Sequence, residues 1–169
     1  MFESIQDFIT GREIDNVGSE ASRQIFEKFL VETKGFLKKE ICVDEPLVVQ
    51  FKGQDYVSAI DLIVCCHNKP FMAITCVAGS IGSYEREILA GARLVYEFQI
   101  PFAVSTDARN AVMMDTVTGK TIGQGLTAIP SRQAAQKHME SVQETLFAPE
   151  KKEREMIIYR SFNMEKVNR

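Results

Sequence analysis

Asp61 is the side chain of this sequence best placed to do chemistry, because it lies inside an otherwise apolar run at residues 57–64. A carboxylate in such surroundings is costly unless it is ion-paired, hydrogen-bonded or bound to a metal ion. A second apolar run, residues 71–77, follows after a turn. The residues leave two interpretations of Asp61 open: a functional acid, or a structural carboxylate that bonds backbone amides at a bulge.

More charged side chains gather at the start of the next predicted helix. Ser83 is a candidate cap, Glu85, Arg86 and Glu87 follow it, and Arg93 lies two turns further on. Acids in the first turn of a helix are also favoured by the helix dipole alone. The two arginines are candidates for nucleic-acid contacts, or for structural salt bridges with these acids or with the buried aspartate.

Hydrophobic periodicity predicts the elements that position these residues. Strands are predicted at residues 47–51, 56–66, 71–77, 101–106, 111–115 and 121–123. Helices are predicted at residues 19–33, 84–98, 131–147 and 150–168, and a short helix with a loop before residue 19. Apolar runs as continuous as 56–66 are typical of strands covered on both faces. The order predicts an α/β fold with a mixed sheet and helices packed on it.

The length of 169 residues is that of one domain. We expect this domain to span residues 1–148, with a core at about 19–132 and a helical C-terminal extension at 149–169. The start of the chain has neither the basic nor the apolar part of a signal peptide, and no apolar run approaches membrane-spanning length. A cytoplasmic protein without membrane contact is therefore expected.

Charge and cysteine content narrow the possible functions. The net charge is −3, so a contact with DNA would need a locally basic patch. The sequence Cys65-Cys66-His67 suggests a metal site, but no CxxC or HxxxH spacing supports one. We therefore expect the four cysteines to be reduced thiols that pack as small apolar side chains.

Several short motifs, in a fixed order, carry a family resemblance. They are HNKP at 67–70, AGS at 78–80, AGARL at 90–94, VSTD at 104–107, DTVTGK at 115–120, GL at 125–126 and IPS at 129–131. In these motifs the chain resembles the N-terminal nuclease domain of type I restriction enzyme R subunits, and more closely small stand-alone proteins described as having that domain. The resemblance covers residues 19–132 and implies a restriction-endonuclease-like mixed sheet of the PD-(D/E)xK superfamily.

The resemblance also implies where an active site would lie. The superfamily places an acid on the first long strand, an acid and a lysine on the next strand, and often a glutamate on the first helix. Asp61 matches the first acid and Glu20 the helix glutamate, and both would hold Mg²⁺. The second acid falls on Thr75 and the lysine on Val77, which lack the charge and the hydrogen-bond donor that this chemistry requires. This site looks degenerate.

Some relatives move a catalytic residue to the neighbouring helix, so Glu85, Glu87 and Arg86 are candidates to rebuild the site. Three functions follow. The first is a nuclease-fold protein without catalysis or cofactor that binds nucleic acid through Arg86 and Arg93, or binds a protein partner. The second is an active Mg²⁺-dependent endodeoxyribonuclease with a rearranged site, in which Glu20, Asp61 and a third acid converge. The third is a dimerisation module that uses the apolar residues 156–159.

Overall fold

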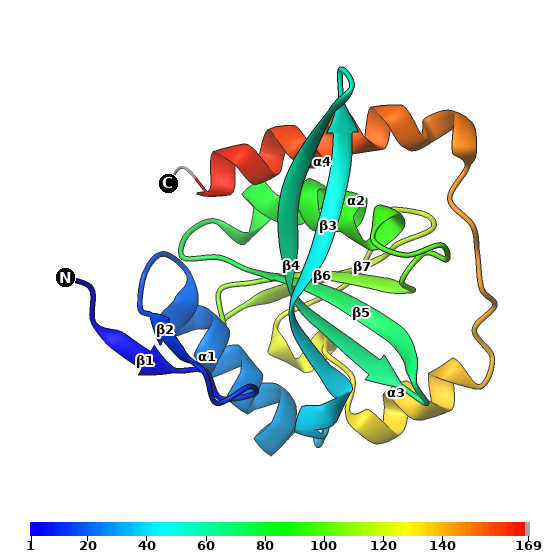
Figure 1. Cartoon of the computed structure of the whole chain (residues 1–169). Coiled ribbons are helices and arrows are strands. Elements are labelled where there is room, and N and C mark those ends of the chain that lie inside the picture. Colours follow the sequence, from blue (N-terminus) through cyan, green and yellow to red (C-terminus); the bar gives the residue numbers. More distant parts are fainter. Residues whose placement is uncertain (168–169) are drawn as a thin grey trace.

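The computed structural model of the protein describes residues 1–167 and confirms an α/β fold, with helices flanking a six-stranded mixed sheet (Figure 1). The strands lie in the order β3-β4-β5-β6-β7-β8, and every neighbouring pair is antiparallel except β5 and β6, which are parallel. They are β3 (Ile41–Phe51), β4 (Gln54–Cys66), β5 (Lys69–Cys76), β6 (Phe102–Thr106), β7 (Ala111–Asp115) and β8 (Thr121–Gln124).

Four α-helices pack on this sheet. They are α1 (Glu20–Lys28), α2 (Glu85–Leu94), α3 (Arg132–Met139) and α4 (Lys152–Val167). A π-helical turn, η1 (Phe29–Thr33), continues α1. The 3₁₀ turns are η2 (Lys38–Glu40), η3 (Ile81–Tyr84), η4 (Leu126–Ala128) and η5 (Pro149–Lys151). Among residues 1–167, no helix combines the length and the apolar character needed to span a bilayer.

Two apolar cores form on the two faces of the sheet. Leu62 and Val64 on β4 belong to the core shared with α1 and α3, whereas Ile63 between them belongs to the core shared with α2 and α4. Side chains alternate between the two faces along a strand. Because both faces are covered, these strands appear in the sequence as continuous apolar runs instead of alternating ones.

The β3–β4 hairpin changes its packing partner along its length. Val43 pairs with Leu62 and Glu45 with Ile60, and the ladder passes over Asp44 and Asp61 between these pairs. Asp44 has a positive φ of 54°, which is uncommon for a residue other than glycine. Beyond this point the hairpin crosses α4 (Figure 1), with which β3 is in contact. The break in the ladder therefore lies beside the acid that the sequence singles out.

The predicted helix before residue 19 is wrong. This segment forms a hairpin of β1 (Ser4–Gln6) and β2 (Glu13–Asp15), which pair in antiparallel fashion. The Asp7 carboxylate accepts hydrogen bonds from the backbone amides of Ile9 and Thr10, and Gly11 has a φ of 72°. These contacts close a tight turn, for which an aspartate and a glycine are well suited.

Two predicted helices are shorter than expected. The helix expected to reach Phe98 ends at Leu94, and the helix expected to reach Phe147 ends at Met139. In both cases the chain leaves the helix to make a tertiary contact: the Gln99 amide donates to the Thr145 carbonyl, at 2.8 Å. The last predicted helix exists as α4, and its expected final residue, Asn168, lies outside the described residues.

The apolar residues near the C-terminus serve the chain's own core. Tyr159 is buried in the core under α2, and Met156 packs against that core. Of the four residues 156–159, Ile157 alone is exposed. Dimerisation through this segment stays a prediction.

Candidate functional site

Asp61 is held at the junction of β4 and β5. Its Oδ2 atom accepts a hydrogen bond from the backbone amide of Cys76, at 2.8 Å, and lies 3.1 Å from Nζ of Lys166. The half-buried carboxylate is thus both hydrogen-bonded to the backbone and ion-paired. These contacts offset the cost of placing a charge in an apolar strand.

Thr75 joins this acid to a second one. Thr75 lies on β5, and its Oγ1 atom is 3.4 Å from Asp61 Oδ2 and 3.3 Å from Glu87 Oε1. A hydroxyl has a single proton, so it donates to one carboxylate at a time. Burial raises the pKa of Glu87, and the nearby charge of Lys166 offsets part of this effect. The residue at the degenerate acid position therefore connects Asp61 to an acid on α2.

Lys166 completes this group from the last turn of α4. Its Nζ atom lies 2.7 Å from Thr75 Oγ1, 3.1 Å from Asp61 Oδ2 and 3.5 Å from Glu87 Oε1. An ammonium group has three donors, and three acceptors surround this one. Burial alone lowers the pKa of Lys166, but the charges of Asp61 and Glu87 outweigh it and raise that pKa above its usual value. Sequence reasoning missed this residue.

A polar stripe on α4 orients the site. Asn163 donates from Nδ2 to Glu87 Oε2 at 3.2 Å and accepts from the hydroxyl of Tyr56 at 2.6 Å. One turn earlier, the hydroxyl of Tyr159 lies 2.8 Å from that of Ser58. Asn163 and Tyr159 are almost completely buried. The face of α4 that meets the sheet thus carries hydrogen-bonding side chains at Tyr159, Asn163 and Lys166.

Arg86 and Arg93 are engaged by the same helix. Arg86 forms a two-pronged contact with Glu155 at 2.5 and 2.8 Å, and Arg93 reaches the same carboxylate at 3.0 Å. Burial alone raises the pKa of Glu155, but the hydrogen bonds and charges of the two arginines lower it overall. Both arginines thus form structural salt bridges, although with neither of the partners that the sequence suggested. Their proposed contact with nucleic acid stays a prediction.

Glu20 lies near the group but turns to another partner. Its Oε2 atom is 2.7 Å from Arg23, which also contacts Asp44 at 2.8 Å. Burial raises the pKa of Glu20, Arg23 lowers it, and the nearby charges of Asp44 and Asp61 raise it further. Glu85, at the start of α2, makes none of the contacts described above within residues 1–167.

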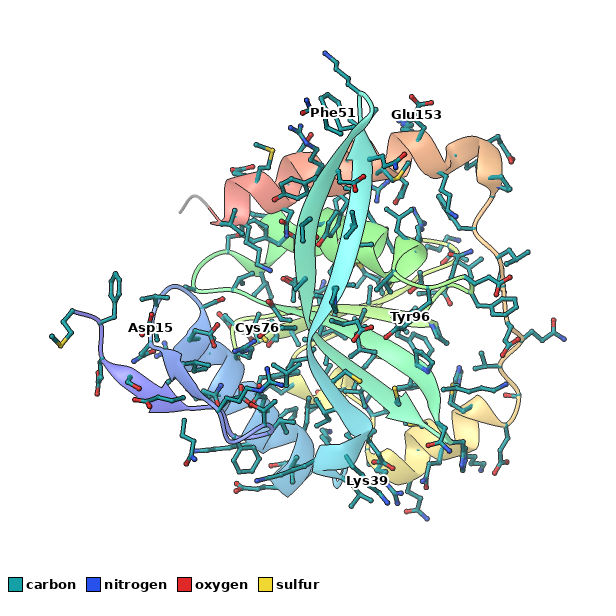
Figure 2. The ribbon with its side chains drawn as sticks, viewed as in Figure 1. Asp15, Lys39, Phe51, Cys76, Tyr96 and Glu153 are labelled. Atoms are coloured by element: carbon teal, nitrogen blue, oxygen red, sulfur yellow. The ribbon has the colours of Figure 1, made fainter. Side chains whose placement is uncertain are left out.

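Val77, at the degenerate lysine position, forms part of a cavity of about 270 Å³ beside the site. Lys166 lies in the wall of the same cavity, together with residues around the start of α1 and the 78–80 turn. Cys76, the last residue of β5, also lines this cavity and is labelled in Figure 2. Lys166 of α4 therefore lies near the position at which the superfamily has its lysine and this chain has Val77.

Mg²⁺ does not fit the site as it is arranged. Asp61, Glu87 and Thr75 offer the hard oxygen atoms that Mg²⁺ prefers. However, the ammonium of Lys166 lies among all three, in contact with an oxygen of each. Nowhere in residues 1–167 do three His, Cys, Asp or Glu side chains form a group able to hold a metal ion. The four cysteines are free thiols.

Comparison with known proteins gives a family match. The family described as "Type I restriction enzyme R protein N terminus" matches residues 18–130. No curated protein and no solved structure matches the chain significantly. The matched span contains Glu20, Asp61, Thr75 and Glu87 and ends before α4, which supplies Lys166. Because the match covers well over half of the sequence, the chain belongs to the family of type I restriction enzyme R protein N-terminal domains.

Proposed function

We propose that this chain is a non-catalytic member of its family, which binds DNA without cleaving it. The observation that carries the first part is the position of the Lys166 ammonium, within 3.5 Å of oxygens of Asp61, Thr75 and Glu87. A divalent cation would have to displace a charged group that already neutralises the acids. Val77 cannot replace the lysine on β5, since its side chain has no donor.

A basic patch supports the DNA-binding part. Because the net charge of the chain is −3, binding to DNA requires a local excess of Lys and Arg. Such an excess lies around η1, η2 and α3, where Lys34, Lys38, Lys39, Arg132 and Lys137 outnumber Glu32 and Glu40, the second of which is ion-paired with Arg132 at 2.8 Å. Arg132 and Lys39 line one polar cavity of about 250 Å³, and the Arg132 amide donates to the Lys34 carbonyl at 2.8 Å. We name these five residues the basic patch; Lys39 marks it in Figure 2.

The test of catalysis uses the whole chain with single- and double-stranded DNA and RNA, in Mg²⁺, in Mn²⁺ and in EDTA. We expect no metal-dependent cleavage by the wild type. Cleavage that requires the metal and is lost in Asp61→Asn would overturn the non-catalytic proposal. Asp55→Asn, an exposed aspartate at the tip of the β3–β4 hairpin, is the matched control.

The test of binding measures the affinity for a DNA duplex by fluorescence anisotropy at several salt concentrations. Replacing both Lys38 and Lys39 with Gln should weaken binding and reduce the slope of log K against log salt by roughly two. Replacing both Lys151 and Lys152, exposed lysines far from the patch in sequence, should change neither quantity. Equal effects of the two double variants would contradict a specific role of the basic patch.

A rearranged active nuclease is the second candidate, and one observation favours it. Two acids and a lysine, the residue types of the superfamily's site, meet at Thr75 from β4, α2 and α4. In that case Lys166 would take the role of the lysine missing at Val77. Metal-dependent cleavage by the wild type that is abolished in both Glu87→Gln and Lys166→Met would establish this candidate against the first.

A further inference from the structure

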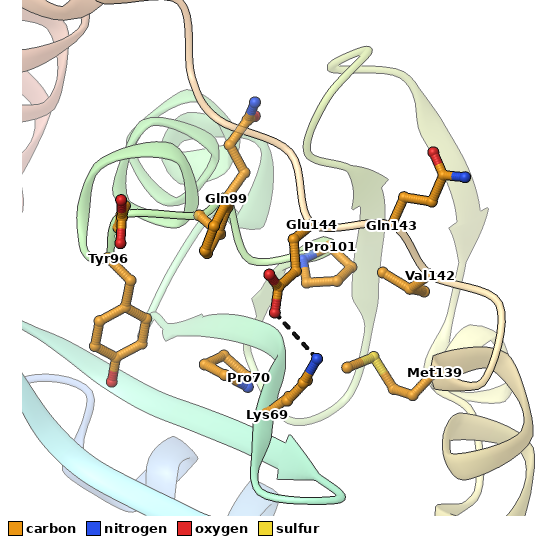
Figure 3. A pocket seen from close by; sticks show the side chains of 11 residues that line it. Lys69, Pro70, Tyr96, Gln99, Pro101, Met139, Val142, Gln143 and Glu144 are labelled. Atoms are coloured by element: carbon orange, nitrogen blue, oxygen red, sulfur yellow. Dashed lines mark hydrogen bonds and ion pairs between the residues drawn. The ribbon is translucent and has the colours of Figure 1, made fainter.

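An apolar cavity of about 300 Å³ lies at the start of β5 (Figure 3). Its wall is built from four segments: the start of β5, the connection between α2 and β6, the end of α3, and the connection from α3 to α4. Most of the surface that faces it is apolar, from Pro70, Tyr96, Pro101, Met139 and Val142. β5 separates this cavity from the Asp61 site by roughly 20 Å, since a strand rises about 3.3 Å per residue.

Backbone contacts fix the walls of the cavity. The Gln99 amide donates to the Thr145 carbonyl at 2.8 Å, and the Gln99 side chain donates from Nε2 to the Leu146 carbonyl at 3.1 Å. Phe98 and Leu146 also form an isolated antiparallel bridge. The two irregular segments are thus joined to each other next to the cavity.

The charges at the cavity favour a neutral ligand. Lys69 Nζ lies 3.0 Å from Glu144 Oε1, and Figure 3 shows this ion pair reaching across one side of the cavity. Both side chains remain about half exposed, so the pair belongs to the mouth and not to the floor. The other charged residue of the lining is Glu97, which is exposed. The lining therefore holds no unpaired cation with which to bind an anion.

We propose that this cavity binds a small, neutral aromatic molecule of one or two rings. The side chains of Pro70, Pro101 and Tyr96 are rings against which a planar molecule packs, and the thioether of Met139 adds a favourable sulfur–aromatic contact. Apolar cavities in proteins take up aromatic molecules of matching size. A volume of about 300 Å³ lies at the lower end of the range for ligand sites.

The first experiment uses the full-length chain labelled with ¹³C at its methionine methyl groups, with indole as the probe. Met139 lines the cavity, whereas Met113 is buried in the core shared with α1 and α3. The ring current of bound indole should shift the Met139 signal in a saturable way and leave Met113 unchanged. Absence of a saturable Met139 shift in the wild type would overturn the proposal without recourse to any variant.

The second experiment tests the chemistry and the place of binding. Benzoate, which carries a negative charge, should bind at least tenfold more weakly than indole, and equal binding would refute the preference for a neutral ligand. Val142→Trp should fill the cavity and weaken indole binding at least tenfold. Val57→Trp, at an exposed position on the β3–β4 hairpin, should leave it unchanged. An unchanged affinity in folded Val142→Trp would place the indole elsewhere and overturn the proposal.

Discussion

Lys166 Nζ lies 3.1 Å from Asp61 Oδ2, although 105 positions separate the two residues in the sequence. The contact joins the last turn of α4 to the centre of the sheet. It also brings a positive charge to the place where the two carboxylates of Asp61 and Glu87 approach the same threonine. The stability of the fold and the chemistry of the site therefore depend on the same ammonium group.

Lys166→Met should lower the free energy of unfolding by about 1–3 kcal/mol, because it leaves two partly desolvated carboxylates without their counter-charge. The loss should fall short of that for a fully buried pair, since Lys166 and Asp61 keep 15% and 19% of their side-chain surface exposed. Urea denaturation measures the change. Lys152→Met, at an exposed lysine on the same helix, is the matched control.

The same variant should gain stability from Mn²⁺, because the oxygens of Asp61, Glu87 and Thr75 become available to a divalent cation and a ligand of the native state stabilises it. The wild type should gain less under the same conditions. Equal responses of the two proteins to Mn²⁺ would show that Lys166 does not compete with a cation.

Glu155→Gln should loosen α4, because Arg86 and Arg93 lose the carboxylate that joins them to this helix. Amide hydrogen exchange in α4 should accelerate at least tenfold, whereas exchange in β4 to β6 should not change. Glu153→Gln, an exposed glutamate on the same helix, should have no such effect. If both variants exchange at the wild-type rate, Glu155 does not hold α4 in place.

The contact of Glu155 with Arg86 and Arg93 also predicts that the stability of α4 depends on pH. The native pKa of Glu155 lies below the ordinary value of 4.5, so its contribution is complete above that value and is lost as the pH falls through the native pKa. In acid, amide hydrogen exchange in α4 of the wild type should therefore approach the rate seen in Glu155→Gln.

Glu27→Gln should stabilise the protein in alkaline solution and not in mild acid. Glu27 is fully buried, and burial together with the charge of Asp7 raises its pKa from 4.5 to about 8. The native state thus holds its proton more tightly than the unfolded state. The resulting loss in the free energy of unfolding is absent below about pH 4.5, grows until about pH 8 and is constant above it, reaching roughly 5 kcal/mol at about 1.36 kcal/mol per pKa unit.

Urea denaturation at pH 5 and pH 9 measures this difference. Glu32→Gln, at an exposed glutamate one turn beyond, is the control. A Glu27→Gln variant whose stability follows that of the wild type in parallel at both pH values would mean that Glu27 ionises normally.

Local patterns of the sequence determined the six strands of the main sheet and the order of the elements from α1 onward, but not the β1–β2 hairpin. The runs at 56–66 and 71–77 are apolar at nearly every position, and both became strands covered on two faces. Asp61 was identifiable because one charge among apolar neighbours requires a partner, whatever the fold. The family assignment also followed from the sequence, because the motifs that carry the resemblance occur along it in a fixed order, and the family model matches residues 18–130.

The tertiary structure alone decided which partners these groups have. Lys166 lies 91 positions from Thr75, and Glu155 lies 69 positions from Arg86, so no local periodicity links them. Their meeting depends on how α4 docks across α2 and β3, which is the sum of many weak contacts. The ends of α2 and α3 were decided in the same way, because the contact of Gln99 with Thr145 outweighs the helical propensity of both segments.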